Sequence, residues 1–266
     1  MTIFNVLDRL NKKDLEIDQL ASRREVFNKL GNLGKKLALG SVPVGLAAVT
    51  SSKAYASSEK IANVLNFALL LEYLEAEFYV LGLDSGVIPA GSDAEKIYMQ
   101  ISKHETAHVE FLKSAINSIG GDPIEKPGFD FTVGGAFDTF GNYDVFLILS
   151  QAFEDTGVRA YKGQAANLID SNDILTAALQ IHSVEARHAS EVRRLRSGQK
   201  GWVTQDGVWE GMPSEVRAVY AGEDNTVQGG LELTAITDID ADAITEAYDE
   251  PLSKEEVTAI ASLFLV

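Results

Sequence analysis

Between Ser58 and Gly82 the apolar residues recur every three to four positions, which is the spacing of one face of an α-helix. That face carries Leu65, Ala68, Leu69, Glu72, Ala76 and Tyr79. Three further segments are compatible with long helices: Ser92 to Gly120, Tyr143 to Leu168, and Asp173 to Arg196. At a rise of about 1.5 Å per residue, each segment makes a helix about 40 Å long. The pattern therefore predicts four long helices of similar length.

The links between these segments predict how the helices are connected. The first and second segments, and likewise the third and fourth, are joined by short links. The second and third are separated by Asp122–Gly141, a stretch rich in Gly, Pro and Phe that is long enough for a crossover. Ser92-Asp93-Ala94-Glu95 has the capping-box pattern of a helix start, and Gly120-Gly121 is typical of a helix end. We expect an all-α four-helix bundle with one long crossover.

The four histidines of the chain all lie on the second and fourth predicted helices. Two of them complete the motifs Glu105-x-x-His108 and Glu185-x-x-His188. Positions three apart share one face of a helix, so each motif directs one carboxylate and one imidazole toward the same point. One such pair is a short motif and a weak signal by itself.

The first and third helices repeat a second pattern. Glu72 is followed seven residues later by Tyr79, and Glu154 is followed seven residues later by Tyr161. The series Glu, Tyr, Glu-x-x-His therefore occurs twice, as a duplicated helical hairpin would give. One Glu from each of two helices and Glu-x-x-His from each of the others is the set that holds two metal ions in a bundle core. The residues around Glu72 and Glu154 are mostly apolar, which favours a buried position for both.

Composition narrows the chemistry further. The chain of 266 residues has no cysteine, which excludes disulfides, thiolate metal sites and iron–sulfur clusters. Oxygen and imidazole ligands suit iron, manganese or zinc, and four carboxylates balance the charge of two divalent ions. The net charge is −16 and no basic stripe accompanies the aromatic residues, so nucleic-acid binding is not expected.

On these motifs the chain resembles ferritin-like domain proteins, particularly the branch described as desiccation- or stress-related. The resemblance implies two iron or manganese ions, with Glu72 and His108 at one ion and Glu154 and His188 at the other. Glu105 and Glu185 would bridge the two ions. Glu75 competes with Glu72, since it lies one turn further along nearly the same face, and the spacing to Tyr79 favours Glu72.

The resemblance also implies an oxidoreductase that reacts the metal ions with dioxygen or peroxide, as a ferroxidase or a peroxide-detoxifying protein under oxidative or drying stress. Manganese catalases and rubrerythrin-like peroxidases share related ligand sets, so the reaction stays open. The alternative is a non-catalytic structural or interaction protein on the same bundle, and a zinc enzyme is a third option that the ligand set disfavours. The chain departs from storage ferritins in its leader and long tail, which argues against a mineral-storing cage and leaves a homo-oligomer open.

The remaining polar residues of the bundle carry weaker expectations. Tyr79 and Tyr161 could hydrogen-bond the carboxylates of the opposite helix or supply electrons, and plain core packing is the alternative. We expect His104 to point toward the surface, because its neighbour Glu105 faces the metal. For His182 we weigh contact with the metal ligands against partial exposure and favour the latter.

Residues 1–56 resemble an export leader. Arg23-Arg24 precedes an apolar stretch from Leu37 to Thr50, and Ala54-Tyr55-Ala56 has the small-x-small pattern cut by signal peptidase. These features predict export through a twin-arginine-like signal, to the periplasm, with an amphipathic helix and linker as the alternative. The apolar stretch is too short to span a membrane, so stable membrane insertion is not expected.

We expect residues 57–198 to form the bundle and residues 199–266 to form an acidic, mostly irregular extension. Between Trp202 and Glu256 the chain has fourteen acidic residues and two basic ones. Ser253-Lys254-Glu255-Glu256 predicts a capped short helix near the C-terminus. The acidic segment is expected to be solvated, with cation gathering as a second interpretation.

Overall fold

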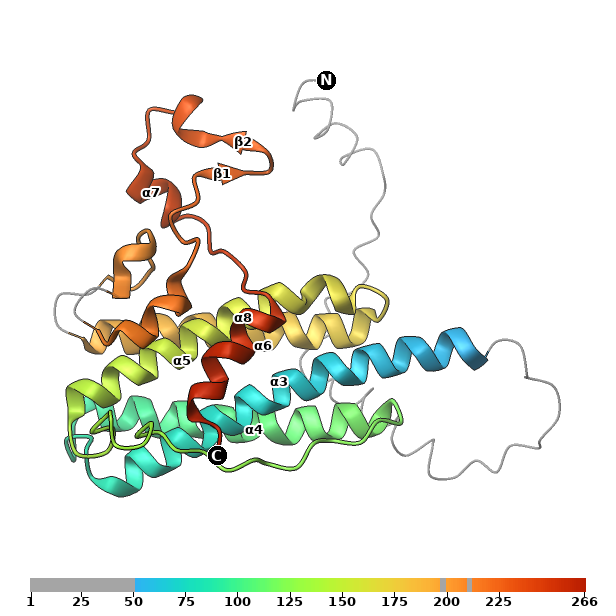
Figure 1. Ribbon diagram of the computed structural model, residues 1–266, viewed down its shortest axis with the longest axis horizontal. Helices are drawn as coiled ribbons and strands as arrows, with labels where there is room; N and C mark the ends of the chain where they lie inside the picture. Colours follow the sequence, from blue (N-terminus) through green and yellow to red (C-terminus); the bar gives the residue numbers. More distant parts are fainter. Residues whose placement is uncertain (1–50, 197–199, 210–211) are drawn as a thin grey trace. The chain divides into compact units, whose positions relative to one another are not determined.

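A computed structural model describes residues 51–196, 200–209 and 212–266 of the chain, with side chains from residue 58 onward. Four long helices form a bundle (Figure 1): α3 Ser51–Ser85, α4 Asp93–Ser118, α5 Tyr143–Gln164 and α6 Asn172–Leu195. A 3-10 turn, Ala165–Leu168, extends α5. The predicted all-α bundle is confirmed: α4, α5 and α6 lie where the apolar spacing placed them, and α3 begins at Ser51, seven residues before the predicted Ser58.

The ends of α4 follow from local hydrogen bonding. The Ser92 side chain accepts from the Glu95 amide at 3.1 Å, which satisfies a free amide of the first turn. The Glu95 carboxylate accepts from the Gly91 amide at 2.7 Å, so the return bond of the expected capping box goes one residue further back. At the other end Gly120 has a φ of +78°, a value that glycine adopts without strain, and this left-handed residue stops the helix.

Hydrogen bonds fix the crossover between α4 and α5 where it enters α5 and near its middle. Asn142 begins α5, because its side chain accepts from the amides of Asp144 and Val145. Further back, Asp130 donates its amide to the Phe264 carbonyl at 2.8 Å, and Val266 donates to the Gly128 carbonyl at 3.2 Å. The crossover therefore pairs with the C-terminal residues of the chain.

The C-terminal extension has more regular structure than its composition suggests. Two short strands pair in antiparallel register through Gly229-Gly230, and both glycines have positive φ as a tight hairpin requires. The Ser253 capping box is complete and starts the last helix, as predicted. The elements are the 3-10 turns Asp206–Trp209, Ser214–Tyr220, Leu233–Ala235 and Ser262–Phe264, strands β1 Val227–Gln228 and β2 Leu231–Glu232, and helices α7 Ala241–Thr245 and α8 Lys254–Ala261.

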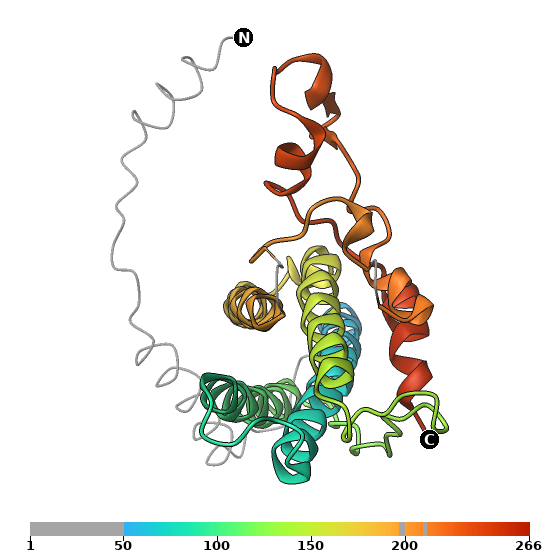
Figure 2. The same ribbon diagram turned by 90° about the vertical axis from the view of Figure 1, so that its left-hand side faces the viewer.

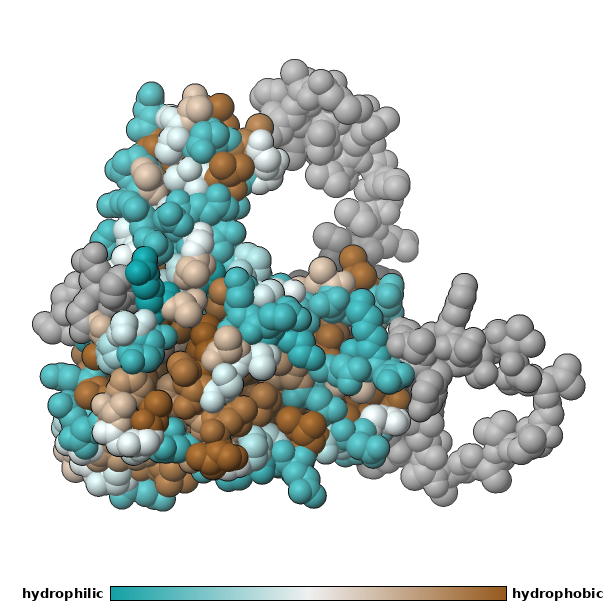
Figure 3. Space-filling model, viewed as in Figure 1, coloured by the Kyte–Doolittle hydropathy of each residue, from teal (hydrophilic) through white to brown (hydrophobic). Residues whose placement is uncertain are grey.

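Helix α8 covers the groove between α3 and α5. Ile260 and Ala261 of α8 line a small hollow together with Leu71 and Leu74 of α3 and Phe153 of α5. Figure 2 shows α8 on the side of α5 that faces away from α6. Hydrophobic residues gather at the surface over this region (Figure 3), where Leu263 and Val266 are exposed. The extension thus packs against the bundle, and the purely solvated segment expected from composition is not what the structure shows. The domain boundary at 198/199 stays a prediction.

The expected leader falls on residues 1–56, and residues 1–50 lie outside the described part of the chain. Helix α3 begins at Ser51, within the expected leader. Export and cleavage stay predictions. Among the described residues, no helix combines the length and apolar character needed to cross a membrane.

Candidate metal centre

The six predicted ligands lie on the inward faces of the four bundle helices. Glu72 of α3 and Glu154 of α5 are completely buried, as their apolar neighbours predict. Helices α4 and α6 contribute the two Glu-x-x-His pairs, and the spacing of three brings each carboxylate and imidazole to one side of its helix. The structure brings all six side chains together in the middle of the bundle.

Three glutamates surround the imidazole of His108. Its Nδ1 lies 3.2 Å from Glu72 Oε2, 3.1 Å from Glu105 Oε2 and 3.1 Å from Glu185 Oε1. These residues come from α3, α4 and α6, so three helices meet at this point.

The imidazole of His188 has a matching environment. Its Nδ1 lies 2.8 Å from Glu105 Oε1, 3.3 Å from Glu154 Oε2 and 3.6 Å from Glu185 Oε2. Glu105 and Glu185 therefore each turn one oxygen toward His108 and the other toward His188. This is the geometry that a carboxylate needs in order to bridge two ions.

Two groups of ligand atoms result, each with its atoms within 4.8 Å of one another. The first consists of Glu72, Glu105, His108 and Glu185, and the second consists of Glu105, Glu154, Glu185 and His188. Each group offers three carboxylates and one imidazole, a donor set that suits iron or manganese. The structure supports the statement that these buried groups could hold metal ions.

Two tyrosines orient the outer glutamates across the bundle. The hydroxyl of Tyr79 on α3 donates to Glu154 Oε1 on α5 at 2.5 Å, and the hydroxyl of Tyr161 on α5 donates to Glu72 Oε1 on α3 at 2.5 Å. Each bond leaves the Oε2 atom of its glutamate facing the histidine. Both tyrosines pack in the core, and each also makes the expected hydrogen bond to the carboxylate of the opposite helix.

Burial and mutual charge control protonation in the centre. Burial raises the pKa of Glu105 and that of Glu154, the latter to about 7. Burial alone would lower the pKa of His188. The nearby carboxylates of Glu154, Glu105 and Glu185 outweigh the effect of burial and raise this pKa to about 12. Burial also acts to raise the pKa of Glu185, but the neighbouring charged histidines outweigh burial and lower this pKa to about 2. Without a cation, the histidines act as the positive charges of the centre.

The hydrogen bonding within the centre is incomplete. Five of its buried atoms make no hydrogen bond among the described residues, although the histidine and carboxylate atoms lie close together: Glu105 Oε1, Glu154 Oε2, Glu185 Oε1, Glu185 Oε2 and His188 Nδ1. Buried polar atoms are nearly always satisfied, and a group of exceptions at one point needs a reason. Cations placed between the oxygens would satisfy these atoms and reduce the repulsion among the carboxylates. The residues present therefore fit a pair of metal ions.

Glu75 is a fifth buried glutamate and stands apart from both ligand groups. Its pKa is raised well above the usual range by burial, and next by the charge of Glu185. The structure places Glu72, and not Glu75, against His108. The carboxyl of Glu75 lies instead beside Gly157 of α5.

The other two histidines of the chain are both half-buried. His104 was expected to point to the surface; it is partly exposed, and its ring also stacks on His188 at a 10° interplanar angle, with Nδ1 2.8 Å from His188 Nε2. The helical face of α4 alone could not reveal this contact, because His188 reaches across from α6. His182 is half-buried and its Nδ1 lies 3.0 Å from the Val158 carbonyl, which agrees with partial exposure.

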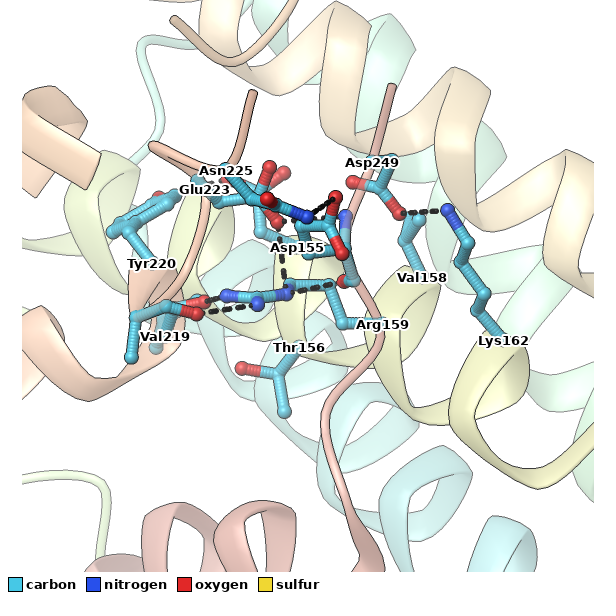
Figure 4. Close-up of polar contacts among 12 residues, drawn as sticks. Asp155, Thr156, Val158, Arg159, Lys162, Val219, Tyr220, Glu223, Asn225 and Asp249 are labelled. Carbon is cyan, nitrogen blue, oxygen red and sulfur yellow. Dashed lines mark hydrogen bonds and ion pairs between the residues drawn. The ribbon is translucent and has the colours of Figure 1, made fainter. Parts of the chain in front are cut away.

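Sequence reasoning missed a buried polar cluster on the outer face of α5 (Figure 4). Arg159 is almost completely buried and donates to the backbone carbonyls of Val219, Ala221 and Glu250 in the extension. It also pairs with Glu223 at 3.0 Å. No residue type in the sequence marks these contacts, because backbone carbonyl partners leave no trace in it.

A second part of this cluster begins at Asp155, next to Glu154. Tyr220 donates to Asp155 Oδ2 at 2.8 Å, and Arg193 of α6 pairs with Asp155 Oδ1. Gln151 donates to the Tyr220 hydroxyl at 2.8 Å. Helix α5 therefore holds the metal-facing glutamate on one side and the extension on the other.

Comparison with known protein families gives one match. The model of the ferritin-like domain matches residues 60–198, just over half of the 266 residues, and this range includes all six predicted ligands. No curated protein matches the chain.

Proposed function

The chain belongs to the ferritin-like domain family, and on that premise we propose that it binds two iron or manganese ions and uses them to reduce dioxygen or peroxide. The observation that carries the proposal is the arrangement of Glu105 and Glu185. Each turns one oxygen to His108 and the other to His188, so each can serve both ions at once.

The ligand assignment follows from the two groups of atoms. Glu72 and His108 hold one ion, and Glu154 and His188 hold the other. The four glutamates neutralise two divalent ions, which makes the loaded centre nearly uncharged inside the bundle. Tyr79 and Tyr161 keep the outer carboxylates turned toward the ions.

When bound, the pair of ions supplies two electrons, one from each ion, which with two protons convert dioxygen to hydrogen peroxide or hydrogen peroxide to two water molecules. The chain provides the buried environment in which that chemistry takes place. The bundle excludes bulk water from the buried carboxylates, and the two histidines release their protons when they become ligands. The resulting activity is an oxidoreductase of the ferroxidase or peroxide-detoxifying kind.

Two wider aspects belong to the same proposal. Likeness to the stress-related branch supports a role in protection during oxidative stress or drying. The arginine pair and the Ala54-Tyr55-Ala56 pattern support export to the periplasm. N-terminal sequencing of the protein recovered from the periplasm tests the second point, since a mature chain that begins at Ser57 is expected.

The deciding experiment is the metal content per chain of protein purified without chelator. We expect about two iron or manganese ions per chain, and their loss in Glu105→Ala/Glu185→Ala. The matched control is Glu110→Ala/Glu191→Ala, which removes two exposed glutamates from the same two helices. The control protein should keep both ions.

A thermal melt distinguishes the remaining possibility, a non-catalytic bundle. A ligand bound only by the folded chain must raise the melting temperature. Wild type that binds neither metal after anaerobic loading, with an unchanged melting temperature, would leave the glutamates as a structural network and favour the interaction protein.

A further inference from the structure

An apolar cavity lies between all four helices at one end of the bundle. The space open to the centre of a water-sized sphere is about 20 Å³, above the 10–15 Å³ or so that a molecule the size of one water requires. Its walls include Phe67, Ala68, Leu112, Ile181 and other apolar side chains from the four helices. Almost no polar surface faces the interior.

The cavity lies next to the metal centre along the axis of the bundle. Ala68 precedes Glu72 by one helical turn, Leu112 follows His108 by one turn, and Ile181 precedes Glu185 by one turn. Tyr161 connects the two directly: its ring lines the cavity and its hydroxyl donates to Glu72 Oε1 at 2.5 Å. A molecule in the cavity is therefore separated from the proposed ligands by one layer of side chains.

The other end of the cavity adjoins the surface. A wide hollow is lined by polar residues, among them Lys60, Asn63 and Asn167. It shares Val64 and Gln164 with the apolar cavity, so these two side chains form the partition between them. The amide of Gln164 is turned to Asn167, which donates to its Oε1 at 3.0 Å, and this keeps the polar end of Gln164 on the outer side.

We infer that this cavity is the binding site through which dioxygen, rather than hydrogen peroxide, reaches the metal centre. The inference rests on the proposed function and narrows its substrate. Dioxygen is apolar and loses little on leaving water. Hydrogen peroxide would give up its hydrogen bonds on entering a cavity that offers almost none in return, and this opposes its entry. Water is disfavoured in the cavity for the same reason, so the cavity stays available to a gas.

Two adjacent alanines of α6 provide a matched test. Ala178 lines the cavity, whereas Ala177 is equally buried, at 6% exposure, and lies outside the lining. Ala178→Leu fills the cavity, and Ala177→Leu places the same added volume elsewhere. We expect Ala178→Leu to slow the oxidation of bound Fe(II) by dioxygen about tenfold, with an unchanged rate for hydrogen peroxide. Ala177→Leu should leave both rates unchanged, and metal content should stay the same in all three proteins.

Crystals of the full chain under xenon pressure give a readout that needs no metal. Xenon should occupy the cavity in wild type and in Ala177→Leu, and be absent from it in Ala178→Leu. Ala68→Val, a smaller change in the same wall, serves if Ala178→Leu does not fold.

The outcomes separate the two proposals. Normal dioxygen rates in a cavity-filled variant, or equal slowing with dioxygen and peroxide, overturn the inference and leave the metal function standing. A wild-type protein that takes up xenon but oxidises no bound iron overturns the proposed function, while the cavity remains a site for small apolar molecules.

Discussion

Glu75 and Gly157 face each other from equivalent positions of the two helical hairpins. Each follows a metal-facing glutamate by three residues, Glu72 in the first hairpin and Glu154 in the second. A Cβ on Gly157 would lie 3.2 Å from Glu75 Oε1, closer than an ordinary contact. The missing side chain in one hairpin thus makes room for the extra carboxyl of the other, and the duplicated motif is asymmetric at this point.

This relationship predicts a coupling between the two positions. In the interior of a helix, Gly→Ala stabilises by about 1 kcal/mol through backbone entropy. We expect Gly157→Ala to give that gain in a Glu75→Ala background, and much less in wild type, where Glu75 must move aside. A double-mutant cycle on urea unfolding of the metal-free protein measures the difference. Equal effects in the two backgrounds would show that Gly157 is not needed to seat Glu75.

The reciprocal tyrosine bonds predict a loss of metal affinity without loss of fold. Tyr79→Phe frees Glu154, and Tyr161→Phe frees Glu72, so each outer carboxylate can turn away from its ion. Partners that orient a ligand are worth about 10–100-fold in metal affinity. Isothermal titration with Mn²⁺ measures the loss, and Tyr98→Phe, at a buried tyrosine stacked on Tyr79, is the control. Wild-type affinity in both variants would reduce these tyrosines to core packing.

Metal binding should release protons and strengthen as pH rises. The neighbouring carboxylates raise the pKa of His108, and they raise that of His188 to about 12, so both imidazoles carry a proton at neutral pH. A histidine must lose that proton to become a ligand, and lowering the pH therefore opposes binding. Burial also raises the pKa of Glu105, which must lose its proton to become a ligand, so we expect release of at least about two protons per chain and a rise in apparent affinity of about a hundredfold or more per pH unit. Calorimetry in two buffers of different ionisation enthalpy counts the protons.

The control for this pH dependence is the Glu105→Ala/Glu185→Ala protein, which should bind no metal and release no protons. An apparent affinity independent of pH between 5 and 8, in roughly the range where histidine normally titrates, would contradict the raised pKa values.

The residues that the sequence predicted well are those whose position depends on local spacing. Glu105 and His108 share a helix, so a separation of three residues suffices to place both on the inner face. The repeated interval between Glu and Tyr placed each tyrosine on the same face as a ligand glutamate, but it left open whether Tyr161 would hydrogen-bond Glu72 or only pack in the core. In each case the information lies within one helix or in its repeat.

Contacts that depend on tertiary packing were harder to predict from the sequence. His104 belongs to α4, and its stacking on His188 depends on how α6 is rotated, which no periodicity within α4 expresses. The docking of the extension was hidden for another reason. Arg159 binds mainly carbonyl oxygens, which every residue possesses, so no particular residue type marks the partner segment.

Arg159 therefore predicts how firmly the extension is attached. Its guanidinium is buried, pairs with Glu223, and serves three backbone carbonyls at once. Arg159→Leu would leave the buried Glu223 carboxylate without its cation, with only the Glu250 amide still donating to it, and would remove the shared donor of those carbonyls. Breaking one side of a buried ion pair costs about 3–5 kcal/mol, and we expect a loss of this size in urea unfolding. Limited proteolysis should then cut between residues 212 and 252 faster than in wild type.

Two further variants show whether this loss comes from the unpaired charge. Arg187→Ala removes an exposed arginine from α6 and should change stability by about 0.5 kcal/mol or less. Arg159→Leu/Glu223→Leu removes both charges together and should recover part of the stability, because no uncompensated carboxylate remains buried. If the double variant is as unstable as Arg159→Leu, the lost carbonyl contacts alone explain the effect. If Arg159→Leu is as stable and as protease-resistant as wild type, the extension is held mainly by the apolar contacts of α8.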